Sequence, residues 1–136
     1  MPAWTDLVEV SRFLHEKMHP WEDSLEDVRR GIDYAMSDEP GRGGFIVLAS
    51  VEGHLAGAVV FLETGMAGYV PEVLLLFACV NPEMRGRGLG RRLIEAGLES
   101  CTGQVKLHVE PDNPARRLYE RLGFSSKYLE MRWSRS

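Results

Sequence analysis

The stretch VLLLFACVNPEMRGRGLGRRLI, from Val73 to Ile94, decides the fold of this chain. Residues 73–80 form a continuous apolar run, which predicts a strand that is buried on both faces. Pro82 ends this run, three alternating glycines follow, and an amphipathic helix pattern begins at Gly88. The stretch therefore predicts a strand, a glycine-rich loop and a helix in direct succession.

The N-terminal end of this predicted helix carries four arginines, Arg85, Arg87, Arg91 and Arg92. A helix N-terminus already bears about half a positive charge and normally attracts acidic residues. The four arginines add to this positive charge, which is unfavourable unless an anion binds there. A polyanion fits, because the glycine backbone and the free N–H groups of the first turn can approach phosphate oxygens closely. We interpret the loop as a pyrophosphate-binding site. The alternative is a glycine-rich turn with solvated arginines, since the glycine spacing fits neither the dinucleotide fingerprint nor the Walker loop.

The same residues resemble motif A of the GNAT superfamily of acyl-CoA-dependent N-acyltransferases. The core of that motif is Gln/Arg-x-x-Gly-x-Gly/Ala, and Arg85, Gly88 and Gly90 occupy its positions here. A second block, NPARRLYERLGF at residues 113–124, resembles the family's motif B with its Leu-Tyr-Glu-x-Leu-Gly-Phe ending. The motifs follow one another in the family's order. The resemblance is specific over residues 73–124 and implies an α/β fold.

The resemblance implies one GNAT-like domain over residues 1–136, with a mixed central sheet and helices on both of its faces. Periodicity and turn signals predict two helices, three strands, a helix, a strand, a helix and a strand, at 4–18, 25–35, 45–51, 55–62, 73–80, 88–100, 104–109, 114–122 and 127–133. Family members usually open with a strand before the first helix and often close with two strands, and we expect this chain to lack the first strand and one of the last two. An exposed sheet edge invites pairing with another chain, so a homodimer is compatible with the sequence.

Composition limits the classes of function. The chain has 136 residues, a net charge of −4, and 44% hydrophobic and 26% charged residues, which suits one globular domain. An acidic chain whose clustered arginines are local, rather than part of a basic face, is not expected to be a general nucleic-acid binder. No apolar run approaches membrane length and the N-terminus has no signal-peptide pattern, so we expect no membrane association and a cytoplasmic location. The two cysteines have no motif spacing and are expected to be free thiols.

One competing motif is His15-Glu16-Lys17-Met18-His19, which matches the H-E-x-x-H signature of zinc hydrolases. That chemistry requires both histidines on one helical face, a third ligand, and Glu16 as the base. Pro20 biases His19 away from helical geometry, and Glu39 is the only third ligand at a suitable spacing. We therefore expect no metal.

The resemblance implies that acetyl-CoA is the acyl donor and that a primary amine of a small molecule or protein attacks its thioester directly, without an acyl-enzyme. It places the pyrophosphate against the loop residues Arg85, Gly86, Arg87, Gly88, Leu89, Gly90 and Arg91. It pairs the pantetheine arm with backbone groups of Cys79 and Val80, where a nearby strand N–H can polarise the carbonyl. The family's pantetheine-binding Asn lies seven residues before the motif B tyrosine, whereas Asn113 lies six before it. Asn113 is therefore either a pantetheine contact or only a helix cap.

For catalysis, the resemblance assigns Tyr119 as the acid that protonates the leaving thiolate, and its alternative role is a core aromatic. Two residues are candidates for the base that deprotonates the ammonium. His108 occupies the place of a glutamate in the ribosomal-protein N-terminal acetyltransferases. Glu72 begins the strand that carries acidic bases in the family's histone-acetylating branch. The position that corresponds to those bases is Leu74 in this chain, two residues further along. A catalytically silent acyl-CoA-binding module of the same fold is the alternative function, because it would keep the loop without needing a base.

Overall fold

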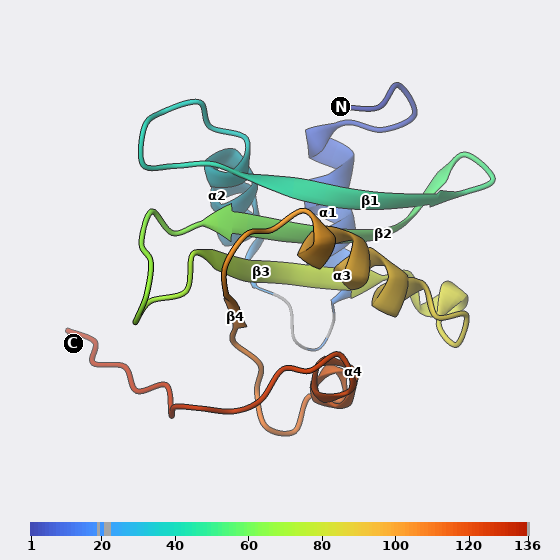
Figure 1. Ribbon diagram of the computed structural model, residues 1–136. Coiled ribbons are helices and arrows are strands. Elements are labelled where there is room, and N and C mark those ends of the chain that lie inside the picture. Colours follow the sequence, from blue (N-terminus) through green and yellow to red (C-terminus); the bar gives the residue numbers. More distant parts are fainter. Residues whose placement is uncertain (19, 21–22, 136) are drawn as a thin grey trace.

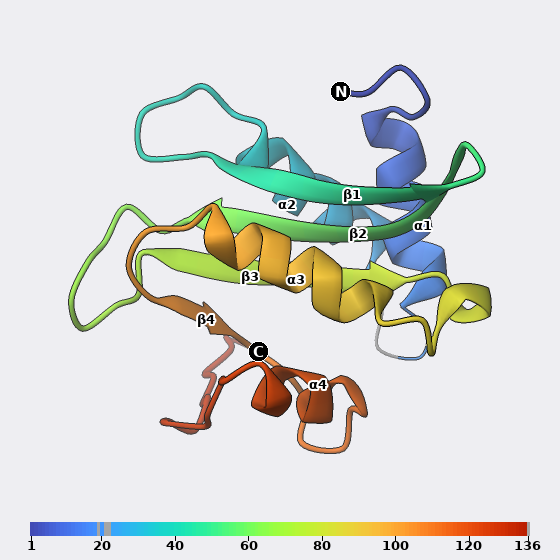
Figure 2. The same cartoon turned by 45° about the vertical axis from the view of Figure 1, so that its right-hand side comes forward.

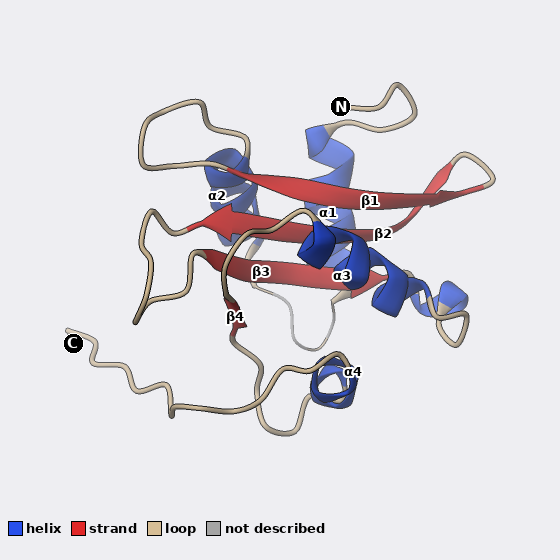
Figure 3. Ribbon diagram, in the orientation of Figure 1, coloured by secondary structure: helices blue, strands red, loops and turns tan. Residues whose placement is uncertain are grey.

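The computed structural model describes residues 1–18, 20 and 23–135. Its elements, in chain order, are α1 (Leu7–Lys17), α2 (Leu25–Ala35), β1 (Gly44–Val51), β2 (His54–Glu63), β3 (Val73–Val80), a short 3-10 helix η1 (Pro82–Met84), α3 (Leu89–Glu99), β4 (Val105–Leu107) and α4 (Ala115–Arg121). No strand precedes α1 within the described residues. The architecture is the mixed α/β arrangement that the sequence predicted (Figures 1 and 3). No helix in the described part of the chain has the length and apolar character needed to cross a membrane.

The four strands form one sheet in the order β1-β2-β3-β4. The first three strands pair antiparallel, and β4 pairs parallel to β3. The β1–β2 hairpin turns at Glu52 and Gly53, whose φ angles of 53° and 79° are typical of a tight hairpin turn. This confirms the hairpin predicted from Glu52-Gly53-His54.

Helices cover both faces of the sheet, with α1 and α2 on one face and α3 on the other (Figures 1 and 2). The apolar stripes of α1 and α2 pack on the first face, in a core of Val10, Phe13, Leu14, Val28, Ile32, Ala35, Leu55, Ala58, Val60, Phe77 and Cys79. The second face packs against α3 and α4, in a core of Val59, Phe61, Val73, Leu75, Leu93, Ile94 and Tyr119. The central strands are therefore buried on both sides, as their continuous hydrophobicity indicated.

Helix caps follow the sequence signals, with one exception at the candidate site. The Ser24 side chain accepts from the Asp27 N–H at 3.1 Å, and the Asn113 side chain accepts from the Ala115 N–H at 2.9 Å. By contrast, α3 begins at Gly88, which has left-handed backbone geometry and no capping side chain. The N-terminus of α3 thus keeps its N–H groups free of a side-chain cap.

The predicted last strand at residues 127–133 is wrong, because residues 125–135 contain no helix or strand. The segment has the alternating pattern of a strand, but a strand forms only when a neighbour supplies its backbone hydrogen bonds. The strand predicted at residues 104–109 is real but shorter, since β4 covers only Val105–Leu107.

Candidate functional site

The strands β3 and β4 separate partway along β3, at one edge of the sheet. Their pairing joins Val73, Leu74 and Leu75 to Val105, Lys106 and Leu107. Beyond that point no strand among the described residues pairs with this edge of β3. Backbone groups alternate sides along a strand, and the Asn81 N–H bonds to Ala56 of β2. Val80 therefore faces the open edge, whereas the backbone of Cys79, predicted to contact the pantetheine arm, faces Ala58 of β2. Backbone groups along this edge are therefore positioned to pair with an extended ligand, as predicted for the pantetheine arm.

A β-bulge lies where the strands separate. On β2, Val60 pairs with Phe77 and Phe61 pairs with Leu75, so Leu76 is the extra residue of β3. Leu75 packs in the core beside α3, whereas Leu76 and Phe77 both pack against the α1–α2 core. A bulge leaves one residue unpaired and re-aims its neighbours, which makes it a suitable place for a backbone donor facing a ligand. No sequence signal in the apolar run predicted this bulge.

The loop after β3 is built by backbone turns. The Asn81 N–H donates to the Ala56 carbonyl at 2.8 Å, and the Asn81 side chain accepts from the Glu83 N–H at 3.1 Å. Gly86 and Gly88 then adopt φ angles of 84° and 73°, which L-residues rarely adopt. No atom lies within 4 Å of a Cβ built on either glycine, so backbone conformation and open space, rather than protein packing, explain these two glycines.

The N-terminus of α3 brings the two sequence motifs together. Arg92 is the first residue whose N–H bonds back along the helix, to the Gly88 carbonyl at 3.1 Å, so the preceding N–H groups lack intrahelical acceptors. A Cβ built on Gly90 would lie 3.5 Å from Val80 of β3 and 3.5 Å from Leu118 of α4. The end of β3, the loop and the motif B helix therefore meet at one place.

The arginine side chains make the surface of this loop cationic. Arg85, Arg87, Arg91 and Arg92 are all exposed, and Arg91 contacts Glu95 one helical turn further on, at 3.2 Å. The charge of Arg91 is therefore partly neutralised. Burial raises the pKa of the Cys79 thiol, and Arg85 lies close enough for its positive charge to oppose that rise. This loop combines positive side chains, free helix N–H groups and left-handed glycines, and the combination favours the binding of an anion.

Tyr119 lies in the core of this region. Its ring packs edge-on against Phe124 at 6.0 Å between centroids, so its predicted alternative role as a core aromatic is real. Burial, and secondarily the neighbouring Cys79 thiol, raise the pKa of Tyr119 to about 12. Burial also raises the pKa of Cys79 to about 11. Both groups are therefore neutral near pH 7, and the Tyr119 hydroxyl is available as a hydrogen-bond donor.

The two candidate bases lie at different places along the sheet. His108 directly follows Leu107, the partner of Leu75, so it lies level with the bulge residue Leu76 and is exposed to solvent. Glu72 lies before the first paired residue of β3, at the end of the strand opposite to the loop. The structure thus brings His108, but not Glu72, to the point where the strands separate.

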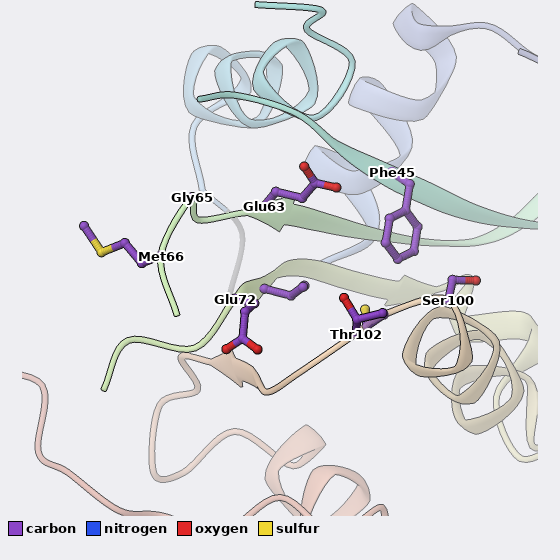
Figure 4. Close-up of a pocket in the computed structure, with 9 residues that line it drawn as sticks. Phe45, Glu63, Gly65, Met66, Glu72, Ser100 and Thr102 are labelled. Atoms are coloured by element: carbon purple, nitrogen blue, oxygen red, sulfur yellow. The ribbon is translucent and has the colours of Figure 1, made fainter. Parts of the chain in front are cut away.

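Glu72 instead lines an open cavity of about 260 Å³. Figure 4 shows Glu63 and Glu72 at neighbouring strand ends, with Phe45, Ser100 and Thr102 beside them. The Glu72 carboxylate packs so closely on Gly103 that a side chain there would collide with it. A second cavity, of about 420 Å³, adjoins Asn113 and includes Arg116 and Arg117. Of the two cavities, only the second touches motif B.

The competing H-E-x-x-H motif gains no support from the described residues. His15 Nδ1 lies 2.9 Å from the backbone carbonyl oxygen of Asp23, and His19 lies outside the described residues. Among residues 1–18, 20 and 23–135, no three His, Cys, Asp or Glu side chains are grouped to hold a metal.

One protein family matches most of this chain. The model of the acetyltransferase (GNAT) family matches residues 4–124. A mycothiol acetyltransferase from Thermobispora bispora is 34% identical over 98% of this chain, which corresponds to 45% of that protein. The chain spans less than half the length of the curated mycothiol acetyltransferases that it matches.

Solved structures share the fold at low sequence identity. A GNAT family acetyltransferase from Streptococcus pneumoniae superposes with a TM-score of 0.71 and 18% identity, covering 96% of this chain and 92% of its own. An aminoglycoside N-acetyltransferase in complex with CoA superposes with a TM-score of 0.68 and 19% identity, covering 94% of this chain and 88% of its own.

Proposed function

This chain belongs to the GNAT family of acetyltransferases, and from that premise we propose that it moves an acetyl group from acetyl-CoA directly to a primary amine of a small molecule or protein. The observation that carries the proposal is the separation of β3 from β4 directly before the arginine-rich loop. The separated strands accommodate an extended ligand arm, and the loop accommodates its anionic end.

The loop from Arg85 to Arg91 holds the pyrophosphate. The N–H groups of Leu89, Gly90 and Arg91 have no intrahelical acceptor and point out of the helix N-terminus. Side chains at Gly86 and Gly88 would obstruct a phosphate approaching the backbone, and these positions are open. Arg85 and Arg87 add exposed positive charge on the same side.

The pantetheine arm then pairs with the free edge of β3 at Val80 and brings the thioester to the bulge at Leu76. An N–H that the bulge leaves unpaired is fixed before the reaction, so it can stabilise the oxyanion without reorganisation. Asn113 caps α4 through its side-chain oxygen. We infer that this cap orients the turn beside the second cavity and that any pantetheine contact of Asn113 is additional.

We assign the base to His108 rather than Glu72, because His108 lies level with the bulge. The imidazole takes a proton from the ammonium, and the neutral amine attacks the thioester carbon. The tetrahedral intermediate collapses with loss of the CoA thiolate, and the second proton that the attacking nitrogen loses converts this thiolate to the thiol. Glu72 would act only through water, because it lies at the opposite end of β3 from the loop.

Tyr119 donates a hydrogen bond to the departing thiolate. With its pKa raised to about 12, complete proton transfer to a thiolate of pKa about 8.5 costs about 5 kcal/mol. Desolvation in the same region raises the pKa of the thiol as well, which narrows this gap. Tyr119 therefore serves best as a fixed donor that stabilises the thiolate while it forms.

The alternative function is an acyl-CoA-binding module without turnover. Both functions require the loop, but only the enzyme releases CoA thiol in proportion to an amine. The experiment is acetyl-CoA turnover against a panel of primary amines, with thiol release and acetylated product measured together. CoA binding without thiol release for any amine would favour the silent module, and absence of CoA binding would contradict both.

A further inference from the structure

A glycine, Gly31, lies in the middle of α2 and is buried against the sheet. Glycine in a helix interior is less stable than alanine, because it loses more backbone entropy on folding. Gly31 has helical backbone geometry, so no left-handed conformation requires a glycine there. The other buried positions of α2, at Val28, Ile32 and Ala35, all carry side chains. The reason for this glycine therefore lies in what α2 packs against.

The space beside Gly31 is filled by the bulge of β3. A Cβ built on Gly31 would lie 2.5 Å from Cδ2 of Leu76 and 2.9 Å from Cε2 of Phe77. Non-bonded carbon atoms are ordinarily separated by about 3.5–4.0 Å. Packing against these two side chains therefore excludes any side chain at position 31.

The bulge itself creates this requirement. Neighbouring side chains of a regular strand point to opposite faces of the sheet, so only one of each pair would meet α2. The register shift instead directs both Leu76 and Phe77 to the face that α1 and α2 cover. The Phe77 ring is only 4% exposed, so it has little room to move away. Gly31 thus provides the hollow that the second of two successive side chains needs.

This contact connects α2 to the reacting centre, although α2 holds no candidate catalytic residue. Under the proposed function, the thioester carbonyl lies at the bulge, where a backbone N–H stabilises the oxyanion. A methyl group at position 31 would push Leu76 outward or flatten the bulge, and either change moves that N–H. Small displacements of a positioned donor are costly, since about 1 Å of misplacement can reduce the rate by about 100-fold.

We propose that Gly31 is a positioning residue for acetyl transfer. By leaving a hollow for the Leu76 side chain, it holds the β3 bulge in the geometry in which a backbone N–H meets the thioester carbonyl. Gly31 touches neither acetyl-CoA nor the amine and acts only through the two side chains that it accommodates. This inference rests on the proposed function, because it assumes that the acetyl group lies at the bulge.

The first test measures the carbonyl directly, without an amine. Infrared difference spectra are recorded for the protein with acetyl-CoA that carries ¹²C or ¹³C at the thioester carbonyl. A hydrogen bond to the carbonyl oxygen lowers its stretching frequency, so we expect a lower frequency in the wild type than in free acetyl-CoA. Gly31→Ala should lose most of that shift. Its affinity for CoA, measured by calorimetry, should stay the same, because the pyrophosphate loop lies at the end of β3.

The second test is a double-mutant cycle with Leu76. Gly31→Ala should lower kcat by about tenfold or more with the KM for acetyl-CoA nearly constant. In a Leu76→Ala background, Gly31→Ala should have a much smaller effect on both kcat and the carbonyl frequency, since the contact at 2.5 Å is removed. This background also serves if Gly31→Ala alone does not fold, because Leu76→Ala proteins with and without Gly31→Ala can still be compared.

The matched control is Ala35→Gly, one turn further along the buried face of α2. Ala35 is 3% exposed, so its replacement by glycine weakens the helix and its packing but adds no atom beside the bulge. Below its melting temperature, Ala35→Gly should keep the kcat and the carbonyl frequency of the wild type. Loss of stability alone is thereby separated from displacement of the bulge.

Three results would overturn the positioning role: an unshifted carbonyl in the wild type, wild-type carbonyl frequency and kcat in Gly31→Ala, or equal losses in Gly31→Ala and Ala35→Gly. Failure of the proposed function has a different signature. A wild type that binds acetyl-CoA and shifts its carbonyl, but acetylates no amine, would contradict acetyl transfer. The carbonyl frequencies of the variants would then still decide whether Gly31 positions the bulge.

Discussion

Leu107 of β4 pairs with Leu75 of β3, and beyond this pair the two parallel strands separate. The next residue on β3 is Leu76, which forms the bulge, and the next residue on β4 is His108. A candidate backbone donor and a candidate base therefore lie level with each other at the point where a ligand arm can enter the sheet. The proposed mechanism depends on this relationship.

CoA binding tests the loop. Gly88→Glu should weaken CoA affinity by at least about 100-fold, because it places a carboxylate against the pyrophosphate and strains a residue at φ 73°. Calorimetry at low and high salt measures the effect, and wild-type affinity should fall as salt rises. Gly53→Glu is the control, since Gly53 has a φ of 79° in open space at the hairpin turn. Equal affinity in the wild type and Gly88→Glu would remove the loop from the site.

The assignment of the base is tested by substitution and pH. His108→Gln should remove most turnover and abolish the acid limb of the kcat/KM profile, because no imidazole remains to accept the proton. Glu72→Gln serves as the comparison and should have the smaller effect, since Glu72 lies at the other end of β3. If His108→Gln keeps both the rate and the acid limb, His108 is structural and Glu72 or a water chain becomes the better candidate.

The role of Tyr119 is separable from its packing. Tyr119→Phe keeps the ring against Phe124 and removes only the hydroxyl, so the melting temperature should change little. Loss of the donor should lower kcat by about 100-fold with the KM for acetyl-CoA nearly constant. Because the pKa of Tyr119 is raised to about 12, the hydroxyl should contribute no limb to a profile between pH 6 and pH 9. Unchanged turnover would leave Tyr119 with only its packing role.

The buried Cys79 thiol predicts a loss of stability at high pH. Burial raises its pKa from 9.0 to about 11, so between these values the folded chain holds a proton that the unfolded chain has lost. The stabilisation is complete below about pH 9 and falls as pH rises through 11, by up to about 3 kcal/mol. Urea unfolding at pH 8 and pH 10.5 should show a smaller decrease for Cys79→Ala than for the wild type. Equal decreases would show that the thiol does not titrate differently on folding.

The packing of α3 on the sheet is tested at Gly97. A Cβ at this position would collide with the ring of Phe61, which is fully buried and stacks on Phe45 at 4.8 Å. Gly97→Ala should therefore destabilise the fold by about 1–3 kcal/mol, although alanine favours a helix by about 1 kcal/mol. Ala96→Gly, at an exposed site of the same helix, measures the helix preference alone. Stabilisation by Gly97→Ala would contradict the close approach of α3 to Phe61.

The sequence by itself determined the elements whose signals are local. The apolar run of β3, the alternating glycines, the caps at Ser24 and Asn113, and the hairpin at Gly53 each follow from the preferences of a few adjacent residues. The resemblance of motifs A and B identified the family, because each motif is a short stretch of adjacent residues. These features need no information about distant contacts.

Only the tertiary structure decided the pairing of strands and its consequences. The bulge at Leu76 arises from the register between β2 and β3, and an all-apolar run gives no sign of a slip. The predicted strand at 127–133 has the right alternation but no partner, since a strand depends on hydrogen bonds from a neighbour far away in the sequence. The sequence offered both His108 and Glu72 as candidate bases but could not place either one along the sheet. The structure places only His108 next to the point, at Leu107, where β4 stops pairing with β3.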